Sequence, residues 1–384
     1  MDYRKMSLQA HYNWKGKIET ICRVPVSNKQ ELCLAYTPGV AEPCLEISKD
    51  VNKSFELTRR WNTVAVITDG TAILGLGDIG PEAGMPVMEG KCALFKAFGN
   101  VDAFPICLNT KDSEEIIKTI KLISGSFGGI NLEDISAPRC FEIENKLKEE
   151  LNIPVFHDDQ HGTAIVVGAA LLNALELVNK DIDKIKVVVN GAGAAGIAIS
   201  KYLLSLGVKN LTVCDKAGII VDNDDRFNKA QQELARIINK NYITGALKDA
   251  MVNADVFIGV SVGNIVSKEM VKSMNEKAIM FTLANPIPEI SYDDAKEAGA
   301  YIVGTGSSEK PNQINNVLVF PGLFRGALDA KHQITKEMMI AATYAIKNTV
   351  SKEELSVEYI LPYAWNQKAH DNVALAVKEI ALKK

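Results

Sequence analysis

The first half of the chain alternates apolar runs with segments of helical spacing. Residues 63–69 are mostly apolar and predict a buried strand, and residues 103–107 predict a shorter one. Apolar positions recur at helical spacing in residues 112–124 and 139–150. The first forty residues show neither pattern clearly. This half therefore predicts strands and helices in alternation, preceded by a segment that the pattern does not assign.

The second half shows the same alternation with stronger signals. Residues 163–177 are apolar almost all round and predict a buried helix. The Val-rich run 186–190 predicts a buried strand, and after an intervening helix residues 211–215 predict the next one. Further strands are predicted at 254–260 and 278–283, and the last sixty residues are mostly helical in pattern. Alternating strands and helices indicate a parallel sheet covered on both faces.

A glycine-rich turn lies between the strand at 186–190 and the helix that follows. It reads Gly191-Ala192-Gly193-Ala194-Ala195-Gly196. A G-x-G-x-x-G turn in this context predicts a dinucleotide whose pyrophosphate lies at the helix N-terminus. Asp215 ends the next strand and is placed to accept hydrogen bonds from the adenosine ribose, which favours NAD. Lys216 follows directly and is able to hold a 2′-phosphate, so NADP stays open.

These patterns predict an α/β protein of two domains, and 384 residues are enough for both. Residues 1–160 form an N-terminal α/β domain in this interpretation. Residues 161–384 form a Rossmann-type domain with a doubly wound parallel sheet, followed by C-terminal helices.

Two acidic pairs precede the glycine turn, Glu133-Asp134 and Asp158-Asp159. Adjacent carboxylates repel each other, and a hard cation such as Mg²⁺ or Mn²⁺ is the usual counter-charge when they are buried. Spacing alone leaves an equal alternative, in which these residues are solvated loop acids and helix caps. His157 and His161 flank the second pair, but histidines in a loop more often serve hydrogen bonding or packing than metal ligation.

Composition excludes several classes of partner and site. The net charge of −4 gives no reason to expect a nucleic acid or a membrane surface as partner. No apolar run reaches the roughly 20 residues that span a bilayer, and the first residues do not resemble a signal peptide. The seven cysteines are scattered and include no Cys-x-x-Cys, which predicts reduced thiols in a cytoplasmic protein.

Several motifs, in order along the chain, resemble those of malic enzymes. They are Tyr36-Thr37-Pro38-Gly39-Val40-Ala41, Gly75-Leu76-Gly77-Asp78-Ile79-Gly80, Met88-Glu89-Gly90-Lys91, Asn131-Leu132-Glu133-Asp134, His157-Asp158-Asp159-Gln160-His161-Gly162-Thr163-Ala164 and Val319-Phe320-Pro321-Gly322. The chain is similar to the short bacterial form, without the phosphotransacetylase-like extension of larger relatives. The resemblance implies oxidative decarboxylation of malate to pyruvate and CO₂, with NAD(P)⁺ and Mg²⁺ or Mn²⁺, and with activity on oxaloacetate as well.

The resemblance also implies roles for individual residues. The first domain would bind substrate and metal, and the second NAD(P). By motif, the implied assignments are metal ligands Glu133, Asp134 and Asp159, catalytic residues Lys91 and Tyr36, substrate- or nicotinamide-contacting residues Asn285 and Asn315, and Asp158 as a support for the ligand loop or Lys91.

The implied chemistry requires a base and an acid. Lys91 would take the proton of the malate hydroxyl, and a free lysine with a pKa of about 10.4 needs its pKa lowered for that role. Tyr36 would protonate the enol of pyruvate. Ala72 stands where larger relatives carry an arginine for the substrate carboxylate, so the partner of that carboxylate stays unassigned.

Two alternatives remain: a metal-dependent oxidative decarboxylase of another 2-hydroxy diacid, and an inactive dinucleotide-sensing protein. We expect a homodimer, and the sequence does not decide whether Tyr36 and Lys91 of one site come from one subunit or two.

Overall fold

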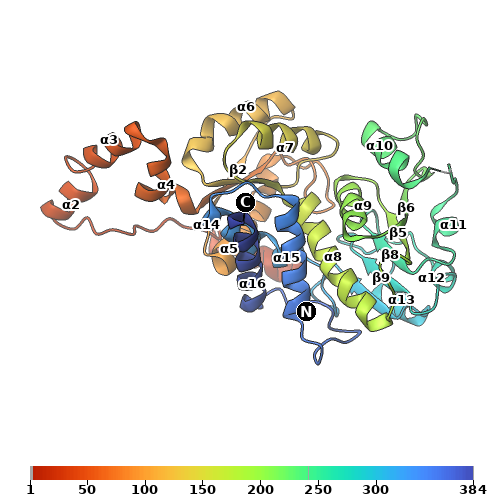
Figure 1. Cartoon of the computed structure of the whole chain (residues 1–384). Helices are drawn as coiled ribbons and strands as arrows, with labels where there is room; N and C mark the ends of the chain where they lie inside the picture. Colours follow the sequence, from red (N-terminus) through yellow and green to blue (C-terminus); the bar gives the residue numbers. More distant parts are fainter. Residues whose placement is uncertain (1–2, 241, 384) are drawn as a thin grey trace.

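The computed structural model describes residues 3–240 and 242–383, which form two sheets (Figure 1). The first sheet has the order β2-β1-β3-β4, and all its neighbouring strands are parallel. Its strands are β1 (Thr63–Thr68), β2 (Asp102–Cys107), β3 (Gly129–Leu132) and β4 (Val155–His157). The strands predicted at 63–69 and 103–107 are therefore confirmed.

The second sheet has the order β10-β9-β8-β5-β6-β7, in which only β7 is antiparallel to its neighbour. Its strands are β5 (Lys186–Asn190), β6 (Asn210–Asp215), β7 (Gly218–Ile219), β8 (Val256–Gly259), β9 (Ile279–Thr282) and β10 (Ile302–Thr305). Crossovers on both sides of β5 make this a doubly wound sheet, as predicted. The helix α9 (Ala194–Leu206) follows the glycine turn.

Helices cover the faces of both sheets (Figure 1). The longer ones besides α9 are α5 (Pro81–Gly99), α6 (Ser113–Ile123), α7 (Arg139–Glu150), α8 (Asp158–Val178), α10 (Lys229–Ile238), α14 (Phe320–Ala330), α15 (Lys336–Thr349) and α16 (Gln367–Leu382). Shorter ones are α4 (Ser54–Leu57), α11 (Leu247–Met251), α12 (Lys268–Lys272), α13 (Tyr292–Glu297) and the 3₁₀ turns η1 (Val51–Lys53), η2 (Arg59–Asn62), η3 (Ser124–Ser126) and η4 (Asn316–Leu318).

The helix α8 joins the two halves and lies in the core. It is 21 residues long, so by length and composition it could cross a membrane, contrary to the expectation that no segment reaches that length. Most of its residues are nevertheless buried against other elements, including α9 and α15. An apolar helix that is mostly covered by other elements is a core helix, and its composition follows from that burial.

The C-terminal helices pack against the first half of the chain. Both α14 and α16 contact α5, and the ring of Phe95 lies 4.7 Å from Phe320 and 5.3 Å from Phe324, centroid to centroid. Val64 of β1 and Val187 of β5 belong to the same hydrophobic cluster as these rings. One core therefore runs through both sheets.

The N-terminal segment lies apart from that core. The helices α1 (Tyr3–Trp14), α2 (Lys29–Ala35) and α3 (Ala41–Lys49) contain no buried residue. Figure 1 shows α2 and α3 projecting away from the rest of the chain. We call residues 18–50 the N-terminal arm.

Candidate active site

The two acidic pairs meet at one edge of the first sheet. Glu133 and Asp134 directly follow β3, and Asp158 and Asp159 begin α8 directly after β4. Because β3 and β4 are parallel neighbours, their carboxyl ends lie at the same edge. One carboxylate oxygen each from Glu133, Asp134 and Asp159 lies within 4.8 Å of the others. The same three residues are the metal ligands that the family resemblance implies.

Lys91 of α5 reaches into this acidic cluster. Its ammonium group lies 2.8 Å from Glu133 Oε1 and 2.7 Å from Asp158 Oδ2, and all three side chains are buried. Burial alone lowers the pKa of Lys91, but the charges of Asp158 and Glu133 outweigh it and raise that pKa above its ordinary value. The two carboxylates thus shift the Lys91 pKa in the direction opposite to the one that a base requires, and a cation held by Glu133 would act against that shift.

The cluster fits a hard divalent cation. Burial raises the pKa of Glu133 and of Asp134, and the negative charge of Asp159 adds to that effect. Asp134 Oδ2 is buried without a hydrogen-bond partner in the described part of the chain. Three converging oxygens that repel each other, one of them unsatisfied, form a donor set suited to Mg²⁺ or Mn²⁺.

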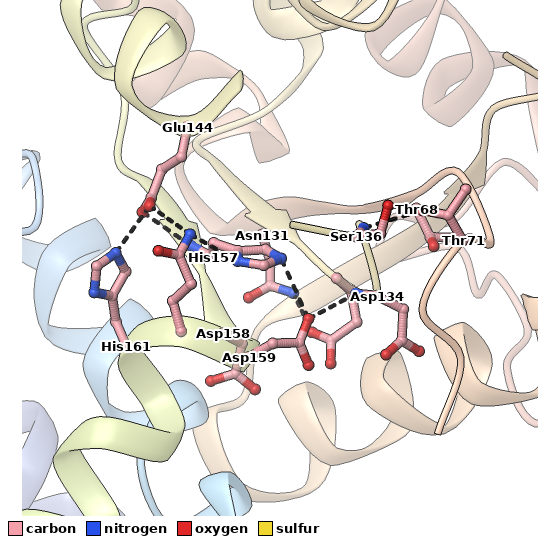
Figure 2. Close-up of polar contacts among 12 residues, drawn as sticks. Thr68, Thr71, Asn131, Asp134, Ser136, Glu144, His157, Asp158, Asp159 and His161 are labelled. Atoms are coloured by element: carbon pink, nitrogen blue, oxygen red, sulfur yellow. Dashed lines mark hydrogen bonds and ion pairs between the residues drawn. The ribbon is translucent and has the colours of Figure 1, made fainter. Parts of the chain in front are cut away.

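A buried hydrogen-bond network reaches Asp159 through His157 (Figure 2). Gln160 donates from Nε2 to Glu144 Oε2 (3.1 Å) and to His157 Nδ1 (2.9 Å). The imidazole proton is then on Nε2, which lies 3.3 Å from Asp159 Oδ2. His161 Nε2 lies 2.8 Å from Glu144 Oε2. Both histidines therefore serve hydrogen bonding here, the commoner of the two interpretations of their sequence position.

Glu144 is the residue of this network that sequence reasoning missed. It lies inside α7 and accepts from the His157 backbone as well as from Gln160. Although burial raises the pKa of this carboxyl, the ion pairs with His161 and Lys148 hold it below its usual range. A single acidic residue in an amphipathic helix carries no sign in sequence that it points inward.

Hydrogen bonds from Arg139 and to Asp134 hold the turn that follows β1. Arg139 Nη2 donates to Asp69 Oδ2 (2.8 Å) and to Thr71 Oγ1 (3.1 Å). The Ala72 N–H then donates to the carbonyl of Asp134 (3.0 Å). Arg139, another residue that sequence reasoning missed, thus holds the loop at 70–72 against the metal ligands.

The glycine turn has the geometry that a dinucleotide requires. A Cβ at Gly196 would lie 1.7 Å from the carbonyl oxygen of Gly191, so only glycine lets the helix pack this close. A Cβ at Gly193 would meet nothing within 4 Å, which leaves space for a pyrophosphate. Gln231, also missed in sequence, donates to the carbonyl of Ala192 (3.1 Å) and to Asp215 (2.6 Å). It thereby joins the turn to the predicted ribose-binding carboxylate.

The two predicted asparagines lie in two different loops, one after β9 and one before η4. Asn285 follows β9, is exposed, and its carbonyl lies so close to Gly75 that a Cβ there would approach within 2.2 Å. Asn315 caps η4, where its side chain accepts from the Val317 N–H (2.9 Å). The adjacent Asn316 is the one packed against Gly162 of α8.

Tyr36 is the predicted site residue that the chain does not bring to the cluster. It ends α2 on the N-terminal arm and is 66% exposed. Its described hydrogen bonds are backbone bonds to Leu32 and Val40 within the arm.

Comparison with known proteins places this geometry in a family. The family model of the malic enzyme N-terminal domain matches residues 15–148, and that of the malic enzyme NAD binding domain matches residues 160–382. The chain is 54% identical over 384 residues to the bifunctional malic/malolactic enzyme of Bacillus subtilis, covering 100% of this chain and 94% of the relative.

Two further comparisons agree. The chain is 55% identical over 367 residues to the NAD-dependent malic enzyme of Geobacillus stearothermophilus, covering 95% of this chain and 77% of the relative. The crystal structure of the NAD-dependent malic enzyme from Thermotoga maritima superposes with a TM-score of 0.93 at 52% identity, covering 97% of this chain and 98% of that one. Since both family models and close relatives over nearly the whole length match, the chain belongs to the malic enzyme family.

Proposed function

We propose that this enzyme oxidatively decarboxylates malate to pyruvate and CO₂, passing hydride to a nicotinamide dinucleotide, and that it also decarboxylates oxaloacetate. The observation that carries the proposal is the meeting of Glu133, Asp134 and Asp159 within 4.8 Å beside the buried ammonium of Lys91. The glycine turn with its free space at Gly193 supplies the cofactor site.

The acidic residues would hold Mg²⁺ or Mn²⁺ through one oxygen each. Such a cation would lower the pKa of the malate hydroxyl and would withdraw charge during loss of CO₂. Lys91 Nζ takes the hydroxyl proton, and Asp158 Oδ2 at 2.7 Å orients that nitrogen. Lys91 must first release its own proton to water, and a cation held by Glu133 would favour this because it would compete for the carboxylate that raises the lysine pKa. Tyr36 donates its phenolic proton to C3 of the enol.

We assign NAD as the cofactor, with NADP as the alternative. Asp215 ends β6 and presents a carboxylate at the position of a ribose-binding acid, where a 2′-phosphate would be repelled. Two of the relatives compared above are called NAD-dependent. The exposed Lys216 beside Asp215 is the feature that would favour NADP.

We also propose a reducing compartment such as the cytoplasm, because the seven cysteines are scattered along the sequence and include no Cys-x-x-Cys.

The decisive test is a spectrophotometric assay of malate with Mn²⁺, run separately with NAD⁺ and NADP⁺. We expect turnover that a chelator abolishes and that added Mn²⁺ restores. Asp134→Asn should remove activity because it takes away a metal ligand, whereas Asp225→Asn, at an exposed acid, should not.

The same assay separates the alternatives. A higher kcat/KM for tartrate or isocitrate than for malate would indicate a decarboxylase of another 2-hydroxy diacid. Binding of NAD⁺ without turnover of any of these acids would indicate a dinucleotide-sensing protein.

A further inference from the structure

We infer that Gln231 sets the preference for NAD over NADP, because its side-chain amide fixes the carboxylate of Asp215 in the orientation that accepts the adenosine ribose. Gln231 has this role only if the glycine turn binds a nicotinamide dinucleotide, so the inference rests on the proposed function. Since Gln231 acts through Asp215, it is a positioning residue and not a catalytic one.

The backbone at Asp215 is held from both sides. Asp215 ends β6, which lies between β5 and β7 in the second sheet. The carbonyl of the preceding Cys214 accepts from the Gly191 N–H (2.9 Å), and Asp215 itself is paired with Gly218 of β7. With the backbone fixed in this way, the side-chain torsions are the freedom that Asp215 has left.

The amide of Gln231 removes that freedom. Its Nε2 donates to Asp215 Oδ2 (2.6 Å) and to the carbonyl of Ala192 in the glycine turn (3.1 Å). Gln231 is only 5% exposed, and these two bonds use both hydrogens of its amide. One buried group thus fixes the predicted ribose-binding carboxylate relative to the turn that would hold the pyrophosphate.

Gln231 is itself oriented by the start of its helix. The Asn228 N–H donates to Gln231 Oε1 (2.8 Å), and the Gln231 N–H donates to Asn228 Oδ1 (3.1 Å), which together form a capping box. The helix α10 that begins here packs against α9 and β6 (Figure 1). Because its oxygen is held at the cap, the nitrogen of the amide faces Asp215 before any cofactor is bound.

A fixed carboxylate discriminates between the two dinucleotides. NAD presents ribose hydroxyls that donate to it, whereas NADP presents a 2′-phosphate that it repels. The amide carries no net charge, so Asp215 keeps its own negative charge. Released from Gln231, the carboxylate would be free to rotate away and leave a 2′-phosphate to the exposed Lys216. The bond also orders the side chain in advance, so that NAD binding does not bear this cost.

The first test is Gln231→Met, which keeps the size of the side chain and removes the amide. Fluorescence titration of the full chain, without metal or malate, gives the dissociation constants of NADH and NADPH. We expect NADH affinity to fall by about 3- to 10-fold, as for one side chain that must be ordered on binding, and NADPH affinity to be kept or to rise. Equal losses for both dinucleotides would indicate a packing role alone and would overturn the inference.

The matched control is Gln232→Met. Gln232 is the same residue type one position further along α10, and it donates to the carbonyl of Phe227 (2.8 Å). This variant should keep the wild-type preference between NADH and NADPH. A shift as large as that of Gln231→Met would overturn the assignment to Gln231.

Gln231→Glu separates the amide from the helix cap. It keeps the oxygen that accepts from Asn228 and replaces the donating nitrogen with an oxygen that repels Asp215. Measured at about pH 8, where a glutamate of ordinary pKa is ionised, NADH affinity should fall at least as far as in Gln231→Met. Wild-type NADH affinity in this variant would show that only the cap matters and would overturn the inference.

A double-mutant cycle then tests whether Gln231 acts through Asp215. In an Asp215→Ala background, Gln231→Met should change NADH affinity little, because the carboxylate that it positions is gone. A further loss as large as in the wild-type background would overturn the inference, as would a wild-type chain that binds NADPH more tightly than NADH. A wild-type chain that binds NADH but does not oxidise malate would overturn the proposed function alone, since these titrations do not depend on turnover.

Discussion

At the scale of single residues, Lys91 shows that the electrostatics of a site depend on contacts that a list of its residues does not reveal. Its motif places it in the chemistry, but its two carboxylate partners, both buried, come from distant parts of the chain. Sequence position reveals the residue and not its contacts, so the charges of Asp158 and Glu133, which raise the Lys91 pKa, cannot be foreseen from the motif.

Lys91→Ala should therefore have two separable effects. Malate oxidation should fall by about 100- to 10,000-fold, as expected for loss of a proton-transfer group, while NAD⁺ binding is kept. Without metal, the fold should lose about 3–5 kcal/mol, because Glu133 and Asp158 are left buried without their counter-charge. Urea unfolding with and without Mn²⁺ measures this, and Mn²⁺ should reduce the difference.

The control for that variant is Lys96→Ala, five residues further along α5, where the exposed lysine pairs with Asp102. Its effect on stability should stay within about 1 kcal/mol. Equal unfolding curves for Lys91→Ala and the wild type without metal would show that the buried pairs do not stabilise the fold.

His157 should act on the metal through Asp159. Removing a residue that orients a metal ligand typically costs about 10- to 100-fold in metal affinity. We expect a loss in that range for His157→Ala, and a smaller one for His157→Gln, whose amide can still donate toward Asp159. The concentration of free Mn²⁺ measured by electron paramagnetic resonance gives the affinity directly.

His161→Ala is the matched control, since His161 contacts Glu144 and not a metal ligand. A loss of Mn²⁺ affinity as large as that of His157→Ala would argue against a specific role for the imidazole next to Asp159.

At the scale of helices and strands, two glycines of the glycine turn have different roles: Gly196 allows close packing of the helix, and Gly193 leaves space for the cofactor. Gly196→Ala would force a Cβ against the Gly191 carbonyl. The free energy of unfolding should therefore fall by about 1–3 kcal/mol, and with it the melting temperature, and the NADH affinity should fall as well. Gly193→Ala has open space in the protein and should lower NADH affinity while leaving the melting temperature unchanged. Calorimetry and NADH fluorescence distinguish the two. A similar loss of melting temperature in both variants would contradict this division.

The elements that sequence predicts best are those whose burial is uniform. β1 and β5 are buried along their length and appear as continuous apolar runs. β4 has only three residues, too few for a pattern. The first turns of α5, from Pro81 onward, show little helical signal in the sequence because Gly84 and Pro86 are poor helix formers, and packing on the sheet overrides that weakness.

At the scale of the whole molecule, the single core through both sheets opposes a division into independent parts. Residue 160 lies inside α8, and the C-terminal helices contact α5 of the first half. Long-range packing leaves no local pattern in the sequence, so the residues of α5 that the C-terminal helices contact are found only in the structure.

Expressed separately, residues 1–160 and 161–384 should therefore fail to fold stably, while the full chain unfolds in one transition. Circular dichroism and limited proteolysis of the fragments measure this. A separately folded 161–384 fragment that binds NADH with native affinity would contradict the expectation.

The position of two carboxylates at the start of α8 affects how strongly the enzyme binds its metal ion. The backbone N–H groups of a helix N-terminus carry partial positive charge and stabilise a nearby carboxylate by about 0.3–1 kcal/mol. Asp158 and Asp159 lie in that first turn, so part of their charge is already compensated and attracts a cation less strongly. We expect a metal that exchanges with the surrounding solution between turnovers, so that activity follows the free Mg²⁺ or Mn²⁺ concentration of the cell.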